Sequence, residues 1–377
     1  LLGMGLTEKQ GGSDVRANTS TAVPVDGGGP GGEYRLTGHK WFTSAPMSDA
    51  FLVLAQAPAG LSCFLVPRIL PDSTRNALQL MRLKDKLGNR SNASAELEYT
   101  DAAGWLVGEE GSGVRVIIKM VNATRLDVTN WSVSLMRQAV SQAAWHSTQR
   151  SAFGDRLIDK PLMQNVLADL ELETEVGTMM VMRLAGAFDR APIDDQEAAF
   201  LRLASAVAKY WLSKRSTPVV REALECVGGN GYVEESILPR LYREAPLNAI
   251  WEGAGNVIAL DVLRALRRSP QSGDAFVAEL DRAVGNNASF DRSRDEVAAL
   301  IGSIATGSSS DEAAARRLVE ALATCWAAAL CLRHEPVLAD AYIRSRLDHD
   351  WGSELGTLDP GLDLDRIVRR AVPEQGS

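Results

Sequence analysis

The hydrophobic pattern of this chain changes its period once, near Gly113, and this change constrains the fold more than any other feature. Before about Trp105 the apolar residues come in short runs, such as residues 51–54 and 63–66, broken by Gly, Pro, Asn and Asp. After Gly113 they recur at helical spacing, as in Val114, Ile117, Ile118 and Val121. The pattern therefore predicts a β half followed by a helical half.

A chain of 377 residues, 45% of them hydrophobic, is long enough to form two or three domains. The short strands predict a small antiparallel β-barrel or sandwich over residues 1–107. Long amphipathic stretches, with helices expected near residues 195–227 and 255–267, predict an antiparallel four-helix bundle over residues 108–270. We expect residues 271–377 to form an appended helical domain. The predicted class is therefore α+β, mainly α.

The charge balance argues against nucleic-acid binding by the surface as a whole. The formal net charge is −8, whereas phosphate binding requires a basic surface or a local basic patch. Residues 271–377 contain 11 Lys and Arg against 18 Asp and Glu, a balance of −7, so most of the acidic excess lies there. Within that stretch Arg366, Arg369 and Arg370 recur at helical spacing and are a candidate basic stripe.

The cysteines indicate a reducing compartment. They are scattered without a CxxC pair, so we predict neither a disulfide framework nor a metal site: Cys63, Cys226, Cys325 and Cys331. The longest nearly uncharged apolar run, residues 321–332, is too short to cross a bilayer. We therefore expect a cytoplasmic protein without a membrane span. The chain begins at Leu1 without an initiator Met or a signal-like segment, and we expect a fragment or a missed start.

Two segments of the β half carry groups that could bind a planar cofactor. Residues 7–14 place hydroxyls beside paired glycines, which permit close backbone approach, although a turn capped by Asp14 is the simpler interpretation in isolation. Residues 38–44 contain Trp41 and Thr43, which as strand neighbours two apart should share one face and could pack against a heterocycle. A core Trp beside a β-forming Thr is the alternative.

Two further segments lie in the helical half. Arg150 and Phe153 stand three residues apart near a helix end, with Gly154 suited to a C-cap, and a solvated Arg with a core Phe would explain them equally well. Residues 228–231, Gly-Gly-Asn-Gly, lack the last glycine of the dinucleotide fingerprint and follow an expected helix, not a strand. We therefore reject a Rossmann interpretation.

Glu252 is the candidate base. It stands among Ile250, Trp251 and glycines, just before an expected helix, and desolvation there would raise its pKa towards neutrality. A glutamate in the first turn of a helix can also simply complement the helix dipole. The position alone leaves both interpretations open.

These five segments resemble, in their order and approximate separation, those of the acyl-CoA dehydrogenase superfamily, over essentially residues 1–270. The wording of residues 3–14, 84–94 and 238–244 resembles the AidB branch, the adaptive alkylation-response flavoproteins, which adds a C-terminal helical domain. Members of the superfamily begin with an α-helical domain that precedes the barrel. We therefore expect this chain to lack that first domain.

The resemblance implies FAD as the cofactor and a homo-oligomer, in most of the family a dimer of dimers, that is, a homotetramer. Leu6, Thr7 and Ser13 would contact the flavin and its pyrophosphate, and Trp41 and Thr43 would line the isoalloxazine. Arg150 and Phe153 would reach the FAD of a neighbouring subunit, and Gly228 and Gly229 would lie at its adenine end. Ala254 and Asn256 complete the implied cofactor-binding set, although Asn256, like Glu225, stands where many relatives have Gln.

The resemblance also implies a reaction on an acyl-CoA substrate. Glu252 would remove the acyl α-proton while the β-hydrogen leaves as hydride to flavin N5, with the thioester carbonyl held by a ribityl hydroxyl and the Glu252 backbone N–H. Some members carry the base on the helix after the barrel, where this chain has Thr124, which cannot serve. We therefore expect an FAD-dependent oxidoreductase acting on a short or branched acyl-CoA, with an unknown flavin reoxidant. The alternative is an AidB-like DNA-binding flavoprotein of the DNA alkylation response with little or no dehydrogenase turnover.

Overall fold

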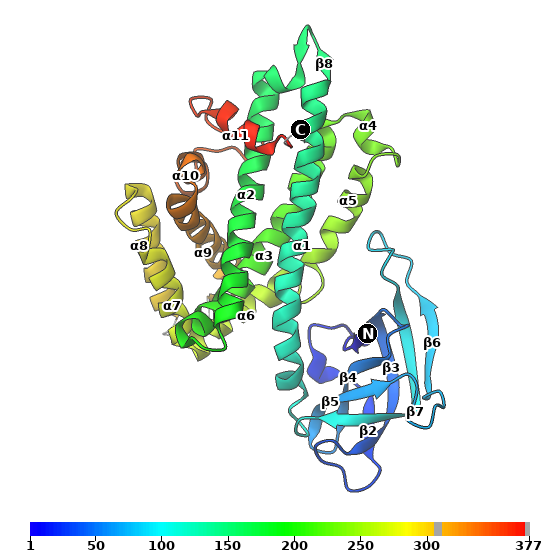
Figure 1. The fold of residues 1–377 in the computed structure, drawn as a ribbon. Helices are drawn as coiled ribbons and strands as arrows, with labels where there is room; N and C mark the ends of the chain where they lie inside the picture. Colours follow the sequence, from blue (N-terminus) through cyan, green and yellow to red (C-terminus); the bar gives the residue numbers. More distant parts are fainter. Residues whose placement is uncertain (305–310, 374–377) are drawn as a thin grey trace. The chain divides into compact units, whose positions relative to one another are not determined.

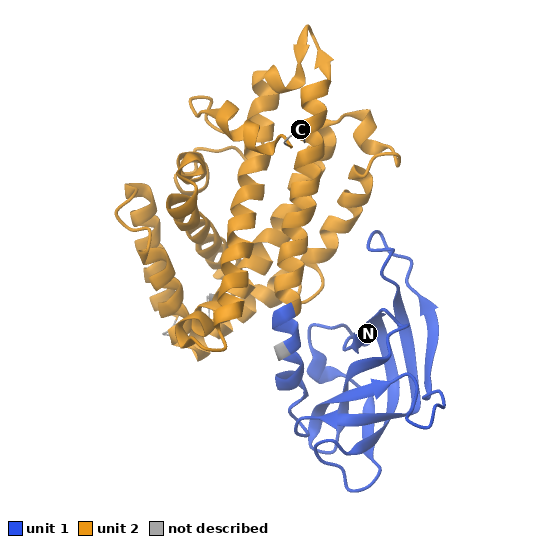
Figure 2. Cartoon of the chain, viewed as in Figure 1, with its two compact units in different colours: residues 1–123 blue, residues 124–377 orange. Residues whose placement is uncertain are grey.

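The computed structural model describes residues 1–304 and 311–373. The chain divides into two compact units, Leu1–Ala123 and Thr124–Ser377 (Figure 2). The helices that follow residue 270 therefore belong to the same compact unit as the bundle. The expected division into three domains, with boundaries after residues 107 and 270, remains a prediction.

The first unit contains a closed β-sheet. Its described residues form one seven-stranded sheet: β1 (Leu2–Gly5), β2 (Thr21–Pro24), β3 (Glu33–Ser44), β4 (Ala50–Ala57), β5 (Gly60–Pro67), β6 (Leu78–Leu83) and β7 (Ser94–Val107). Pairing runs from β3 through β2, β4, β5 and β7 and back to β3, which closes the barrel. Most pairs are antiparallel, whereas β1 and β2 each pair in parallel with β4. The predicted barrel is confirmed, with these two parallel pairings added.

Buried aromatic side chains fill the barrel. Tyr34, Phe51 and Phe64 are fully buried, and the rings of Tyr34 and Phe64 lie 5.0 Å apart. These rings come from three strands, β3, β4 and β5, whose other faces carry more exposed residues. Alternate residues of a strand point to opposite faces, so the apolar runs of the sequence supply this core.

Helices dominate the second unit (Figure 1). The long ones are α1 (Gly113–Gln149), α2 (Pro161–Arg190), α3 (Asp195–Cys226), α6 (Gly255–Arg268), α7 (Pro270–Asp281), α8 (Ala288–Ile304) and α9 (Asp311–His334). The short elements are η1 (Val15–Ala17) in the first unit and β8 (Ser151–Ala152), β9 (Asp155–Arg156), η2 (Leu157–Asp159), α4 (Gly229–Tyr232), α5 (Leu238–Glu244), η3 (Ala245–Ala249), α10 (Pro336–Tyr342), η4 (Ile343–Leu347) and α11 (Leu364–Ala371). In the described parts of the chain, no helix combines the length and the apolar character needed to cross a bilayer.

Helix boundaries follow local sequence signals. The Asp194 side chain caps α3 by accepting hydrogen bonds from the backbone N–H groups of Gln196 and Glu197, at 2.9 and 3.2 Å. Pro161 and Pro270 stand at the first position of α2 and α7, where the missing N–H of proline costs nothing. The helices expected near residues 195–227 and 255–267 are confirmed to within a residue or so.

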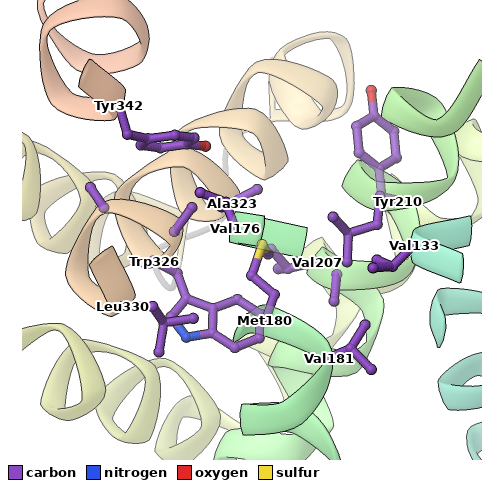
Figure 3. Packing of buried hydrophobic residues seen from close by; sticks show 14 of the residues in the cluster. Val133, Val176, Met180, Val181, Val207, Tyr210, Ala323, Trp326, Leu330 and Tyr342 are labelled. Carbon is purple, nitrogen blue, oxygen red and sulfur yellow. The ribbon is translucent and has the colours of Figure 1, made fainter. Parts of the chain in front are cut away.

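One apolar core joins the bundle to the helices after residue 270 (Figure 3). Trp326 of α9 is fully buried, and its ring meets Phe200 of α3 and Phe276 of α7 edge-on, at 5.5 and 5.9 Å. Arg346, also buried, hydrogen-bonds Glu173 of α2 at 2.8 Å. The C-terminal helices are thus packed into the bundle as part of the same core.

Candidate active site

A buried ion pair joins the loop of residues 6–13 to strand β3. Lys40 Nζ lies 2.6 Å from Glu8 Oε1, and both side chains are buried. Burial raises the pKa of Glu8, but the hydrogen bonds from Lys40, Thr19 and Ser20 outweigh it and lower the value to about 2. Glu8 and Lys40 therefore bring together the two segments of the β half that the sequence singled out.

The backbone of the same loop is fixed by further hydrogen bonds. The Trp41 N–H donates to the carbonyl of Thr7 at 2.8 Å, and the Asn18 amide donates to the carbonyl of Leu6 at 2.8 Å. A Cβ on Gly12 would lie 2.4 Å from the Thr7 hydroxyl oxygen, so only glycine fits there. Leu6 and Thr7 are half-buried in this loop, whereas Ser13 is exposed.

Trp41 and Thr43 differ in their surroundings. The register of β3 against β7 shifts between Lys40 and Thr43, which interrupts the strand alternation from which a common face was expected. Thr43 is fully buried, whereas Trp41 is half-buried beneath Lys84, whose Nζ lies 3.2 Å from the ring centroid. Their shared contact with a flavin therefore stays a prediction, and Lys84 is a neighbour of the indole that the sequence did not reveal.

Thr43 offers an unsatisfied polar group to a ligand. Among the described residues its buried hydroxyl has no hydrogen-bond partner, and the same holds for the hydroxyl of Tyr99. A Cβ built on Gly5 would lie 3.4 Å from each of these two oxygens, so both line one small space. Buried hydroxyls normally find a partner, and a polar atom of a planar cofactor would supply one. The unpaired hydroxyl of Thr43 is therefore compatible with the predicted contact to FAD.

In the second unit Glu252 lies in a tight turn between η3 and α6. Glu252 has φ +54° and Gly253 has φ +103°, both in the left-handed region, which costs a residue other than glycine roughly 1–3 kcal/mol. A Cβ on Gly253 would lie 2.7 Å from Ile258 Cδ1. Helix α6 begins only at Gly255 and has no acidic residue in its first turn, so the interpretation of Glu252 as a first-turn residue is wrong. The turn holds this carboxylate in a strained conformation.

An aromatic contact supports the turn. The rings of Trp251 and Trp131 lie 5.3 Å apart, and the Trp251 indole N–H donates to the Asn248 side-chain oxygen at 3.2 Å. Both indoles pack around the base of the turn, with Trp131 supplied by α1. This contact anchors the turn to α1.

The electrostatics of Glu252 suit a base. Burial raises its pKa above the usual value, and a hydrogen bond from Thr124 and the positive charges of Arg125 and Lys209 partly oppose that rise. Thr124, which stands where some family members carry the base, here contacts Glu252. A raised pKa makes this carboxylate a stronger proton acceptor, as a base requires.

The two cations near Glu252 were not predicted. Arg125 Nη1 pairs with Asp261 Oδ2 at 2.8 Å, and Arg202 Nη2 contacts the other oxygen of Asp261 at 3.0 Å. Lys209 is 1% exposed, and its Nζ donates to the carbonyl of Gly253 at 2.5 Å. Its only sequence signal is a lysine inside the apolar stretch of residues 203–212.

Ala254 and Asn256 follow the turn. Ala254 is the N-cap residue of α6 and is exposed. The side-chain oxygen of Asn256 accepts a hydrogen bond from Arg316 Nε of α9 at 2.8 Å. A helix of the C-terminal region thus contacts the segment that carries the candidate base, and the contact of Ala254 and Asn256 with a cofactor stays a prediction.

Arg150 and Phe153 lie in a hairpin. Helix α1 ends at Gln149, and β8 and β9 pair around Phe153 and Gly154, so the expected role of Gly154 as a helix C-cap is wrong. Gly154 has φ +91° and occupies the turn of the hairpin. Phe153 is 98% exposed, which excludes the alternative of a core aromatic. An exposed aromatic at a hairpin tip is available to a second subunit.

Gly228 and Gly229 form the turn after α3. Gly228 has φ +67° and is the N-cap residue of α4, which begins at Gly229. The element before this turn is the helix α3 and not a strand, in agreement with the rejection of a Rossmann motif. A hollow of about 320 Å³ opens beside this turn, lined by Gln142, Trp145, His146, Val227, Asn230, Val233, Glu235, Ser236 and Leu238. Its volume lies at the lower end of the range of small-molecule pockets, roughly 300–1,000 Å³. The contact of Gly228 and Gly229 with adenine stays a prediction.

Family profiles match both halves of the chain. The profile described as acyl-CoA dehydrogenase, middle domain, matches residues 3–102, and the one described as acyl-CoA dehydrogenase, C-terminal domain, matches residues 111–267. The first covers the barrel strands, and the second covers Thr124 on α1, Lys209 on α3 and the turn that carries Glu252. Together they span the segments from which the resemblance was inferred.

Similar sequences come from bacteria and animals. AidB of Escherichia coli (strain K12), named provisionally as an acyl-CoA dehydrogenase, is 53% identical over 292 residues, which cover 78% of this chain and 53% of AidB. Acyl-CoA dehydrogenase family member 11 of Caenorhabditis elegans is 37% identical over 304 residues, 77% of this chain and 48% of that protein. The chain thus spans about half the length of these relatives.

Solved structures agree with the fold. Caenorhabditis elegans ACDH-11 in complex with C11-CoA has a TM-score of 0.81 at 30% identity, over 99% of this chain and 64% of that one. An acyl-CoA dehydrogenase complexed with FAD from Bacillus anthracis has a TM-score of 0.77 at 18% identity, over 99% and 72%, and so supports the fold alone.

Proposed function

Because the chain belongs to the acyl-CoA dehydrogenase family, in an AidB-like branch, we propose that it catalyses the FAD-dependent α,β-dehydrogenation of an acyl-CoA, with Glu252 as the base. The observation that carries this proposal is the turn at Glu252, where a half-buried carboxylate with a raised pKa stands on a strained stretch of backbone. Such an arrangement is expected of a catalytic group and has no evident value for stability.

The residues of this chain perform the binding and the proton transfer. Leu6, Thr7, Ser13, Trp41 and Thr43 would hold the flavin, which supplies the hydride acceptor when it is bound. The Glu252 carboxylate accepts the α-proton of the acyl group, and its raised pKa makes it a stronger proton acceptor than an ordinary carboxylate. The contact between the indoles of Trp131 and Trp251 anchors the turn that carries this carboxylate to α1.

A short or branched acyl-CoA is the proposed substrate. The name of the C. elegans structure states that ACDH-11 binds C11-CoA, so the substrate panel should extend from short and branched chains to that length. The acyl chain would be chosen by the walls of the substrate cavity, where one methylene changes the rate by roughly 10- to 200-fold. The acceptor that reoxidises the flavin is a separate protein or molecule to be identified.

Anaerobic flavin reduction tests the proposal. The FAD-loaded chain is mixed with each acyl-CoA, and the visible absorbance of the flavin is followed. We expect bleaching with at least one substrate and its loss in Glu252→Gln. The matched control is Glu222→Gln. Burial raises the pKa of Glu222 as well, but this glutamate lies on α3 and pairs with Arg221 of the same helix. An unchanged rate in Glu252→Gln, or no bleaching with any thioester, would refute the proposal.

The contacts of the candidate basic stripe, Arg366, Arg369 and Arg370, do not favour the DNA-binding alternative. Arg369 pairs with Asp365 at 2.7 Å and Arg370 pairs with Glu175 at 2.8 Å, so carboxylates already neutralise two of its three guanidinium groups. Binding through phosphate contacts would weaken steeply as salt rises. A gel shift with duplex DNA at low and at raised salt tests this alternative, and salt-sensitive binding would restore it.

We also propose a homo-oligomer, in which the hairpin of residues 150–156 reaches a neighbouring subunit. The exposed ring of Phe153 at the hairpin tip supports this role, since aromatic side chains are enriched at subunit interfaces. Lys160 steadies the hairpin by donating to the carbonyl of Phe153 at 3.1 Å. Light scattering of the FAD-loaded chain measures the state, and a monomer that retains FAD would contradict it.

A further inference from the structure

A lysine is buried behind the turn that carries Glu252. Lys209 lies in the middle of α3, and its Nζ donates to the carbonyl of Gly253 at 2.5 Å. Its neighbours along the helix, Ala206, Ala208 and Leu212, are buried and apolar. An ammonium in such surroundings loses its hydration and is retained only where it forms specific interactions. The position therefore requires an explanation beyond packing.

The charges around Lys209 come from three elements. Glu252 in the turn, Arg125 on α1 and Lys214 on α3 all act on it electrostatically. Burial, followed by the charge of Arg125, lowers the pKa of Lys209 to about 7, while Glu252 opposes that fall. Lys209 in turn favours the ionised form of Glu252. The lysine and the glutamate are thus coupled across the turn.

The hydrogen bond acts on the strained part of the backbone. Gly253 follows Glu252 directly, and both residues have positive φ. A non-glycine residue keeps such a conformation only when its surroundings fix it, and the Lys209 ammonium fixes the carbonyl at this point. The backbone N–H and the side chain of Glu252 are oriented by the same turn.

We propose that Lys209 is a positioning residue for the Glu252 base: it holds the Gly253 carbonyl, so that the turn keeps the carboxylate in place, and its positive charge favours the ionised carboxylate. This inference rests on the proposed function. Lys209 acts through Glu252 and does not touch the reacting atoms.

Three variants separate the two effects. Lys209→Met removes the donor and the charge, whereas Lys209→Gln keeps a donor without a charge. The comparison is Lys214→Met on the same helix, because Lys214 acts on Lys209 but is not among the charges that act directly on Glu252. All are compared as FAD-loaded protein in flavin reduction by the acyl-CoA that the wild type accepts, over a range of pH.

In Lys209→Met we expect the maximal rate of reduction to fall on the order of 10- to 100-fold, because a displaced base loses its alignment. We also expect the acid limb of the rate profile to move up by about one unit, because an opposite charge near the carboxylate is lost. Lys209→Gln should recover part of the maximal rate but keep the displaced limb. Lys214→Met should keep the wild-type limb.

Amide hydrogen exchange of residues 250–256 gives a readout that needs no substrate. We expect faster exchange in Lys209→Met than in the wild type, with Lys214→Met and Lys209→Gln close to the wild type. An acid limb that stays in place in both Lys209 variants, or equal exchange in all four proteins, would overturn the proposal. If no acyl-CoA reduces even the wild-type flavin, the proposed function fails, while the exchange experiment still tests the role of Lys209 in holding the turn.

Discussion

The Thr124 hydroxyl donates a hydrogen bond to the Glu252 carboxylate, which joins the start of the second unit on α1 to the turn before α6. The resemblance marks Thr124 as the position of an alternative base, and here this residue is a partner of the base. The hydrogen bond favours the ionised carboxylate and so opposes the effect of burial on its pKa. Thr124 cannot act as a base, but its hydrogen bond lowers the pKa of Glu252, the proposed base.

We expect Thr124→Val to raise the pKa of Glu252 further, since the opposing hydrogen bond is lost while burial remains. The base works only when deprotonated, so the rise of the flavin-reduction rate with pH should move to higher pH, by about one unit. Thr124→Ser keeps the hydroxyl and should keep the wild-type profile. A profile that moves to lower pH in Thr124→Val would contradict this account.

The ion pair between Glu8 and Lys40 should make the barrel sensitive to acid. The pKa of Glu8 in the folded protein is about 2, below its ordinary value of 4.5, so its stabilisation is complete above pH 4.5 and is lost as the pH falls towards 2. Glu8→Gln should lack this pH dependence and lower the free energy of unfolding by about 3–5 kcal/mol at neutral pH, since Lys40 stays buried and unpaired. Urea unfolding between pH 2 and 7 measures both.

The double replacement Glu8→Gln with Lys40→Met serves as the control for that experiment. It removes both charges and leaves no buried ion without a partner, so we expect it to be more stable than Glu8→Gln alone. Equal stability of the single and double variants would show that an unpaired Lys40 carries no cost, and a wild-type stability in both would show that the ion pair does not hold the loop.

Much of the fold was predictable from the sequence, because it depends on periodicity. The change of period near Gly113 separated the strands from the helices, and the helix expected from about residue 195 is α3. The parallel pairing of β1 and β2 with β4 was not predictable, since strand order depends on contacts between distant segments. The C-cap expected at Gly154 was wrong because a hairpin turn and a helix end both use a glycine with positive φ, and the sequence does not distinguish them.

The candidate site was predictable only as a set of segments. The carboxylate of Glu252 and the motifs around Thr7 and Trp41 could be named, because their residue types suit the chemistry. The partners of Glu252, Thr124 and Lys209, could not be named, because they approach it only after α1 and α3 have packed. Burial, strain and the pKa of a buried group are properties of the packed structure.

Trp326 links the C-terminal helices to the bundle, and its removal should destabilise both. Trp326→Ala leaves a cavity beside Phe200 and Phe276, and we expect it to lower the free energy of unfolding by about 3–5 kcal/mol. Calorimetry should show α9 and the bundle melting together at a lower temperature. A C-terminal transition that moves by itself, with the bundle unchanged, would show that residues 271–377 form an independent domain.

Phe153 should matter for assembly and little for folding. Its side chain is 98% exposed, so Phe153→Ala should change the free energy of unfolding by no more than about 0.5 kcal/mol. If the hairpin reaches the FAD of a second subunit, the same variant should lose FAD on gel filtration and elute as a smaller species. Leu162→Ala is the matched control, because Leu162 is 84% exposed near the same hairpin but is not one of the residues assigned to FAD. Equal FAD content and equal size in both variants would leave the hairpin without a role in the assembly.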